Sequence, residues 1–417
     1  MSNAGIAYPH HKALLPLLIA LLGAPLVAAC GDDTETGGSG GAGGNPSTGG
    51  SGGTADGGAA EGGAGGVGGG EGGVATTGPI DAPADQWTFV EFPGATCMDG
   101  SPTGIGINPH ATSDDVVIFL MGGNACFNFA SCLIVANPDG YGSEKFDNDV
   151  ADFLSASPYF DRQNPDNPFR DYSYVFVPYC TGDVHAGDKA DVVINDKTYQ
   201  FHGFSNMRQY LERIVPTFTD ASSVVLTGVS AGGFGAAYNY DQVASAFGND
   251  VNVTLIDDSG PPMAEEFVPQ CLQQHFVDTW GIENTLPEDC AECGVNGIFL
   301  EPFINYVFDK YPDRSLGLVS SEGDATIRQF WGFGENDCAS INGAPAAYPE
   351  DKYLAGLEDL RDRIGADGRF KMFLVPGTEH VFVDNGLDAV TVNGVALEDW
   401  IVQGIEGDPN WANVSEP

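Results

Sequence analysis

Short apolar segments rich in β-branched residues recur along the chain and predict buried strands. They lie at residues 116–120, 174–177, 223–227, 251–256, 316–319 and 370–375. Segments with apolar residues at helical spacing fall between several of them, at residues 206–215, 232–247 and 354–364. Such alternation predicts an α/β fold in which helices flank a mostly parallel sheet. Functional side chains in such folds gather beyond the carboxyl ends of the strands.

The N-terminal residues have a different pattern. A weakly basic start is followed by an uninterrupted apolar run at residues 13–27, too short to span a bilayer comfortably and typical of a signal peptide. The run ends in Val-Ala-Ala-Cys, which resembles a bacterial lipobox with Cys30 as the lipidated residue. An ordinary signal peptide with a coincidental cysteine is the alternative. We therefore expect residues 1–30 to direct export.

Residues 31–79 are rich in Gly and almost devoid of bulky apolar side chains, so they cannot bury a core. We expect a disordered tether there and a folded domain over residues 80–417. No Gly/Ser-rich break inside that domain argues for a second one. The chain would then be a membrane-anchored lipoprotein at the outer surface or in the periplasm, or else a secreted protein.

Charge and cysteine content narrow the functional classes. The net charge is −42, with 16 basic against 58 acidic residues, so a nucleic-acid or anionic-membrane surface is not expected. Any membrane contact would come through the N-terminal anchor. Eight cysteines remain beside Cys30, an even number that suggests up to four disulfides in an exported chain. Cys126 and Cys132 are close enough to close one loop. Cys290 and Cys293 lack a second pair at zinc-ligand spacing, so a disulfide is favoured over a metal site.

The most informative motif is Gly-Val-Ser-Ala-Gly, centred on Ser230. It follows the predicted strand 223–227 and precedes the predicted helix 232–247. A strand, a sharp turn through a serine and a helix form the nucleophile elbow, which lifts the serine hydroxyl above the sheet. Ser230 is therefore the candidate nucleophile.

A serine nucleophile needs a base and a residue that orients the base. His380 follows the strand 370–375 and comes after the candidate acids, in the order Ser, acid, His of the α/β-hydrolase fold. His185 is the second candidate base, although it precedes the serine. For the acid, Asp324 follows the penultimate strand and is favoured, while Asp257 and Asp258 are expected to cap a turn. Glu322 is too close to Asp324 to be excluded.

An oxyanion hole requires two fixed backbone donors. One is expected from Ala231, directly after the nucleophile, and the other from the loop after strand 116–120, at Gly123 and Asn124.

Four segments together resemble the pectin acetylesterase and Notum family of carboxylesterases. They are Leu-Met-Gly-Gly-Asn-Ala-Cys from residue 120, Tyr-Cys-Thr-Gly-Asp from residue 179, Thr-Gly-Val-Ser-Ala-Gly-Gly from residue 227, and Ser-Glu-Gly-Asp from residue 321, with Glu-His at 379–380. The resemblance implies an α/β-hydrolase-like fold, no metal or other cofactor, and a triad of Ser230, Asp324 and His380. The sequence departs from the family at Asn124-Ala125, where familiar members carry an aromatic residue.

These observations predict a secreted serine esterase that hydrolyses carboxylic esters, such as an acylated polysaccharide, through an acyl-enzyme. Asn124 makes one wall of the acyl site polar, which favours short acyl groups such as acetyl. Apolar neighbours such as Phe127 or Phe129 could reverse that preference. A non-catalytic surface protein on the same fold, and a lipase or polyester depolymerase with a broad apolar mouth, are the alternative functions.

Overall fold

The computed structural model describes residues 78–364, 370–383 and 389–416. The expected signal peptide, Cys30 and nearly all of the tether lie outside the described residues. A search of the described residues finds no helix with both the length and the apolar character needed to cross a bilayer.

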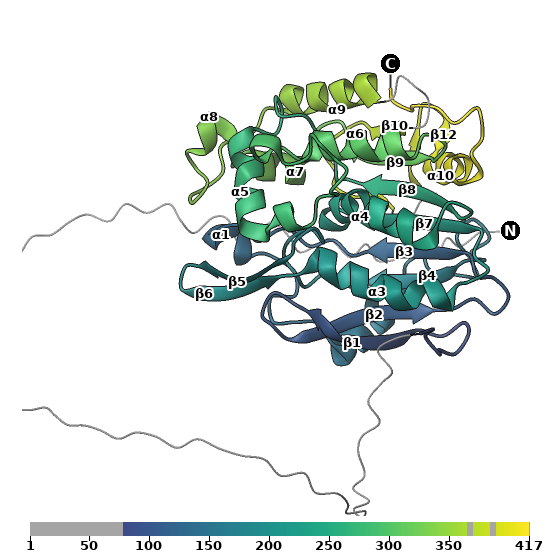
Figure 1. The fold of residues 1–417 in the computed structure, drawn as a ribbon. Helices are drawn as coiled ribbons and strands as arrows, with labels where there is room; N and C mark the ends of the chain where they lie inside the picture. Colours follow the sequence, from purple (N-terminus) through teal and green to yellow (C-terminus); the bar gives the residue numbers. More distant parts are fainter. Residues whose placement is uncertain (1–77, 365–369, 384–388, 417) are drawn as a thin grey trace, which may run out of the picture. The chain divides into compact units, whose positions relative to one another are not determined.

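An eight-stranded sheet forms the centre of the described residues (Figure 1). Its order is β1-β2-β4-β3-β7-β8-β9-β10. The bounds are Thr88–Thr96, Pro102–Asn108, Ser173–Val177, Val116–Leu120, Ser223–Val229, Asn252–Asp258, Leu316–Ser321 and Phe370–Val375, in that order. The six strands from β4 to β10 pair in parallel, while β1 and β2 form an antiparallel edge. The predicted parallel sheet is confirmed.

Two short hairpins lie outside this sheet, one of β5 and β6 (Lys189–Ile194, Lys197–Phe201) and one of β11 and β12 (Thr391–Val392, Val395–Ala396). The α-helices are α1 to α10 at Phe129–Cys132, Ser143–Asp149, Gly203–Thr217, Ala231–Phe247, Gln270–Trp280, Leu300–Lys310, Ala325–Trp331, Glu335–Cys338, Glu350–Ile364 and Leu397–Glu406. A π-helical turn at Val150–Leu154 and 3-10 turns at Ile282–Asn284 and Val295–Gly297 complete the list.

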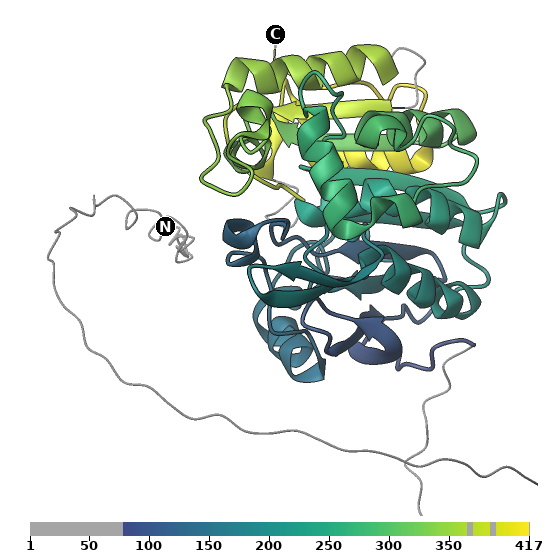
Figure 2. The ribbon, with the colours of Figure 1, turned by 60° about the vertical axis from the view of Figure 1, so that its left-hand side comes forward.

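Side chains of the central strands alternate between two apolar cores, one on each face of the sheet. In β3, Ile118 and Leu120 join one core while Val117 and Phe119 join the other. All of them are essentially inaccessible to solvent. Strands buried on both faces need continuous apolar runs rather than alternating ones, which explains why these segments were visible in the sequence. Figure 2 shows helices on both sides of the sheet.

Four disulfides join the eight described cysteines: Cys97–Cys180, Cys126–Cys132, Cys271–Cys338 and Cys290–Cys293. Cys290 and Cys293 are bonded to each other, so neither has a free thiolate that could bind zinc. Disulfides of this number fit a protein exposed to an oxidising compartment.

Candidate active site

Ser230 lies between β7 and α4, where the chain turns sharply. Its backbone has φ 58° and ψ −121°, a conformation that non-glycine residues rarely adopt. The turn depends on close approach of backbones, because a Cβ on Gly232 would come within 2.0 Å of the Leu120 carbonyl oxygen. The Ser230 N–H donates to Asp258 O at 2.8 Å, which ties the turn to the neighbouring strand. The strain is therefore held by the surrounding sheet.

His380 and Asp324 meet at the adjacent strand ends. His380 Nδ1 lies 2.7 Å from Asp324 Oδ2, and the Asp324 side chain is fully buried. The other carboxylate oxygen, Oδ1, accepts the backbone N–H groups of Thr326 and Ile327, both at 2.9 Å. An ionised carboxylate only accepts, so Nδ1 carries the proton and Nε2 of the neutral ring carries a lone pair.

The Nε2 atom of His380 is buried and has no hydrogen-bond partner among the described residues. It is therefore not bonded to Ser230 Oγ in this conformation. Bonds between a nucleophile and its base are often long in the absence of substrate.

Asp258 joins the serine turn to the histidine segment. Its backbone oxygen accepts from Ser230, and its carboxylate Oδ2 accepts the N–H groups of Phe382 at 2.6 Å and Val383 at 2.7 Å. The next residue, Ser259, accepts the Val381 N–H at 3.2 Å through its hydroxyl. The three residues after His380 are thus held by β8 and the residue that follows it.

Of the other candidate acids, none is placed at His380 Nδ1. Asp257 and Asp258 are the last two residues of β8, which runs two residues beyond the end of the predicted strand 251–256. Asp257 Oδ1 accepts the Gly260 N–H at 2.9 Å, the turn-capping role that was expected for this pair. Burial, followed by the charge of Asp258, raises the pKa of Asp257 well above its usual value. The capping expectation was incomplete for Asp258, whose partners come from the distant histidine segment.

His185, the alternative base, is buried against the loop that follows β3. Its Nε2 lies 2.9 Å from Met121 O, and a carbonyl only accepts, so Nε2 is the protonated nitrogen. Burial lowers the pKa of His185 to about 4. Nearby, the Asp183 carboxylate accepts the N–H groups of His185, Gly187 and Gly203. This network supports the loop that begins at Met121.

The loop after β3 carries the expected oxyanion residues and packs directly on Ser230. A Cβ on Gly122 would lie 2.4 Å from Val229 O and 3.1 Å from Ser230 Cβ. Asn124 has φ 65°, and its side-chain amide donates to Ile134 O at 2.8 Å. Ala231 is the first residue of α4, where backbone N–H groups lack partners within the helix.

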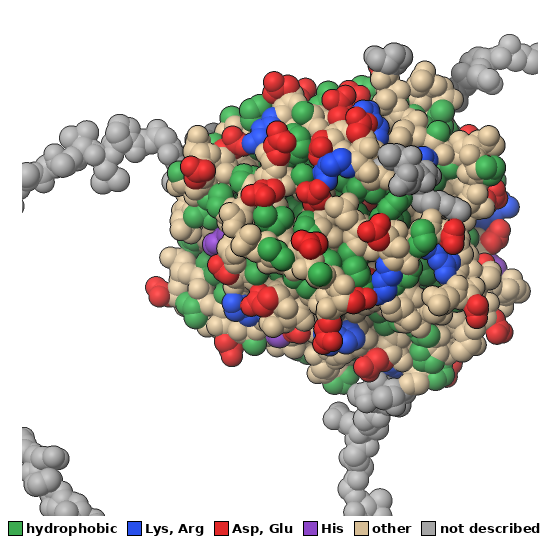
Figure 3. Space-filling view, turned by 45° about the horizontal axis from the view of Figure 1, so that its top comes forward, with side chains coloured by type: hydrophobic (Ala, Val, Ile, Leu, Met, Phe, Trp, Pro, Cys, Tyr) green, Lys and Arg blue, Asp and Glu red, His purple; other side chains and the backbone are tan. Residues whose placement is uncertain are grey.

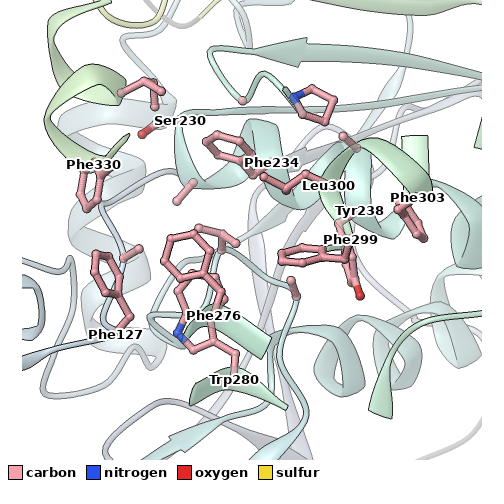
Figure 4. A pocket seen from close by; sticks show the side chains of 18 of the residues that line it. Phe127, Ser230, Phe234, Tyr238, Phe276, Trp280, Phe299, Leu300, Phe303 and Phe330 are labelled. Carbon is pink, nitrogen blue, oxygen red and sulfur yellow. The ribbon is translucent and has the colours of Figure 1, made fainter. Parts of the chain in front are cut away.

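Ser230 opens onto an apolar pocket (Figure 4). The pocket is partly open to solvent. Aromatic side chains from separate segments dominate its lining: Phe127, Phe234, Tyr238, Phe276, Trp280, Phe299, Phe303, Phe330 and Trp331. Ser230 and Phe303 lie on opposite sides of the view in Figure 4. Of these residues the sequence indicated only Phe127 as a pocket candidate, because the others are scattered over four helices and their flanks.

A parallel sheet with a serine turn, a histidine–aspartate pair and a pocket at its carboxyl edge defines an α/β-hydrolase-like protein. A model of the family described as Pectinacetylesterase matches residues 84–304, more than half of the chain, and the chain belongs to this family. The resemblance inferred from the motifs is therefore confirmed.

Two relatives illustrate the similarity. Palmitoleoyl-protein carboxylesterase NOTUM of Drosophila melanogaster is 26% identical over 215 residues, 47% of this chain and 31% of that protein. Pectin acetylesterase 5 of Arabidopsis thaliana is 27% identical over 208 residues, 48% of each protein. The chain thus matches 31% to 48% of the length of these relatives. A crystal structure of the Wnt deacylase Notum from Drosophila superimposes with a TM-score of 0.57 at 17% identity, covering 80% of this chain and 97% of that one. That likeness supports the fold.

Proposed function

We propose that the protein is a serine carboxylesterase. The observation that carries this proposal is the convergence of the strained Ser230, the His380–Asp324 pair and an apolar pocket at one sheet edge. The named relatives are esterases, which agrees with it. A non-catalytic binding protein would have no need to combine a strained serine with a histidine bonded to a buried carboxylate.

In the proposed reaction, His380 Nε2 takes the Ser230 hydroxyl proton as Oγ attacks the ester carbonyl. The oxyanion accepts hydrogen bonds from Ala231 N–H and from the backbone at Gly123 and Asn124. The imidazolium then protonates the leaving alcohol, and water cleaves the acyl-enzyme with His380 again acting as base. Asp324 keeps the proton on Nδ1 throughout.

The pocket lining changes the expected acyl preference. A short acyl group was predicted because Asn124 was taken to make the site polar. Its amide is instead bonded to Ile134 O, and the rest of the lining is overwhelmingly aromatic and aliphatic. Each methylene buried there contributes about 0.8 kcal/mol, so we propose that esters of medium or long apolar acyl chains are preferred to acetyl esters.

Hydrolysis of p-nitrophenyl esters tests the proposed activity. Ser230→Ala should keep the fold and lower kcat/KM by about three to six orders of magnitude. Ser245→Ala is a suitable control, because this exposed serine of α4 contacts the Tyr311 hydroxyl and does not line the pocket. A folded wild type without activity on acetyl to dodecanoyl esters would rule the proposal out.

Export and lipid attachment remain part of the proposal. The four disulfides support an exported protein. Cys30→Ser should release the protein from the membrane fraction while leaving its esterase activity unchanged.

A further inference from the structure

Large apolar side chains are concentrated on one short segment of the surface. Phe129, Leu133 and Ile134 are 52%, 68% and 54% exposed. The described residues have only two other exposed large apolar side chains, Val193 and Val295, which lie on separate segments. Single exposed apolar residues are ordinary, whereas a cluster marks an interaction surface. We call Phe129, Leu133 and Ile134 the apolar rim.

The backbone of this segment is held so that the rim stays exposed. The disulfide Cys126–Cys132 closes it, and Asn128 and Ser131 cap α1 reciprocally, with Ser131 N donating to Asn128 Oδ1 at 2.8 Å. The Asn128 amide also donates to Ile341 O at 2.6 Å, which anchors the segment to a distant loop. A segment fixed at several points cannot turn its apolar side chains inward at low cost.

The rim is continuous with the proposed acyl site. The same stretch of chain supplies Asn124, Ala125 and Phe127 to the pocket lining. The Asn124 amide bonds to the carbonyl of Ile134, a rim residue. Whatever covers the rim is therefore placed beside the pocket that Ser230 faces.

Charge identifies the kind of surface that the rim fits. The sequence has no charged side chain between Asp115 and Asp139, although the chain carries a net charge of −42. Acidic side chains are spread over the face of the molecule in Figure 3. An anionic lipid surface would repel such a protein, while an uncharged apolar surface would accept the rim without desolvating any charge.

We propose, on the basis of the esterase function above, that the rim docks the enzyme on an uncharged lipid surface made of its own ester substrate. Apolar side chains at the boundary would enter the lipid, and an acyl chain could pass into the pocket without crossing water. Hydrolysis should then be faster for aggregated ester than for the same ester in true solution.

Tributyrin, followed from below to above its solubility limit, tests this proposal with the full chain. The wild-type rate should rise more steeply once emulsion forms. The double variant Phe129→Ser/Leu133→Ser should hydrolyse emulsified tributyrin about tenfold more slowly than the wild type. Its rate on soluble p-nitrophenyl acetate should stay within about twofold of the wild-type rate. Val193→Ser, which removes a side chain that is 66% exposed on the β5–β6 hairpin, is the matched control and should change neither rate.

The outcomes separate the two proposals. Absence of wild-type activity on soluble and emulsified ester alike would defeat the esterase function. Soluble turnover with no gain on emulsion, or equal losses in the double variant and the Val193→Ser control, would overturn the rim proposal and leave the esterase function standing. An unchanged melting temperature in the double variant shows that the comparison concerns the surface and not the fold.

Discussion

Asp258 accepts the backbone N–H of Phe382 at 2.6 Å, across 124 positions of sequence. The same residue accepts the Ser230 N–H through its backbone oxygen. One buried aspartate at the end of β8 therefore touches both the serine turn and the segment that follows His380. Neither contact involves a reacting atom, so Asp258 is a positioning residue in the proposed mechanism.

Replacing Asp258 should act on the chemical step through His380. Asp258→Ala leaves the Phe382 and Val383 N–H groups buried without their acceptor, and we expect kcat to fall about 100-fold, corresponding to about 3 kcal/mol. Asp258→Asn keeps an oxygen at the same place and should recover most of the loss. Steady-state kinetics on a soluble ester checks this, with melting temperatures to confirm folding. Equal kcat values in the wild type and a folded Asp258→Ala variant would contradict the role.

Asp324 should be far less replaceable. An asparagine there can turn its amide toward His380, which moves the ring proton to Nε2 and removes the lone pair that accepts the Ser230 proton. We expect Asp324→Asn to lower kcat by about four orders of magnitude, because the histidine is then held in the wrong tautomer. Asp257→Asn is the control, since the Asp257 carboxylate accepts the Gly260 N–H of a turn. A larger loss of kcat in Asp257→Asn than in Asp324→Asn would show that Asp324 is not the acid of the triad.

Much of the fold and of the candidate site could be predicted because the signals are local. Strands such as β3 and β7 are apolar runs buried on both faces, and Ser230 stands in a motif whose strand and helix flanks adjoin it. The antiparallel edge strands β1 and β2 were not predicted, since their polar and glycine positions break the apolar run. Asp258 was taken for a turn cap because its partners are backbone N–H groups, which no sequence pattern displays. The aromatic pocket was missed because its lining comes together only through packing.

The disulfide Cys126–Cys132 offers a test with an internal control. Two disulfides close short loops, Cys126–Cys132 and Cys290–Cys293, and each should contribute about 2 kcal/mol by the loop-entropy relation. Only the first adjoins Gly123, Asn124 and the pocket. Replacing both of its cysteines by serine should lower kcat/KM about tenfold or more at temperatures where the protein is still folded.

The Cys290→Ser/Cys293→Ser variant should lose similar stability but no activity. Activity assays at 20 °C together with thermal unfolding curves distinguish the two. Parallel losses of activity in both variants would mean that the first disulfide acts on stability alone.

His185 should make the fold sensitive to acid. Its pKa is lowered from 6.5 to about 4 by burial, so the folded state binds fewer protons than the unfolded state between these values. Its stabilising contribution is complete above about pH 6.5 and is lost as the pH falls toward 4, to a total of about 3 kcal/mol. The groups that face His185 are the ring of Tyr179 and the Asp183 carboxylate. Burial raises the pKa of Asp183, so the contribution of Asp183 to stability falls as the pH rises, opposite to that of His185.

Comparison with His185→Gln isolates this contribution, because Asp183 and Tyr179 are present in both proteins. Glutamine can still donate to Met121 O but does not titrate. Denaturant unfolding between pH 4 and pH 8 should show a flatter profile for the variant. The same slope in both proteins would show that His185 is not the titrating group.

The acyl preference follows from where the pocket ends. Tyr238, Phe299, Leu300 and Phe303 lie away from Ser230 in Figure 4, so an acyl chain bound at the serine would extend toward them. Wild type should therefore cleave octanoyl esters with a kcat/KM at least about tenfold above that for acetyl esters.

Two variants test where the acyl chain lies. Leu300→Trp adds bulk away from Ser230 and should lower the octanoyl kcat/KM while leaving the acetyl kcat/KM nearly unchanged, because the reacting atoms are not touched. Asn124→Trp instead adds bulk beside the predicted oxyanion donors and should affect both esters. A p-nitrophenyl ester series from C2 to C12 measures all three proteins. A wild type that prefers acetyl esters would contradict this prediction. It would favour a polar acyl site at Asn124 and would show that the aromatic side chains belong to the protein core and do not admit substrate.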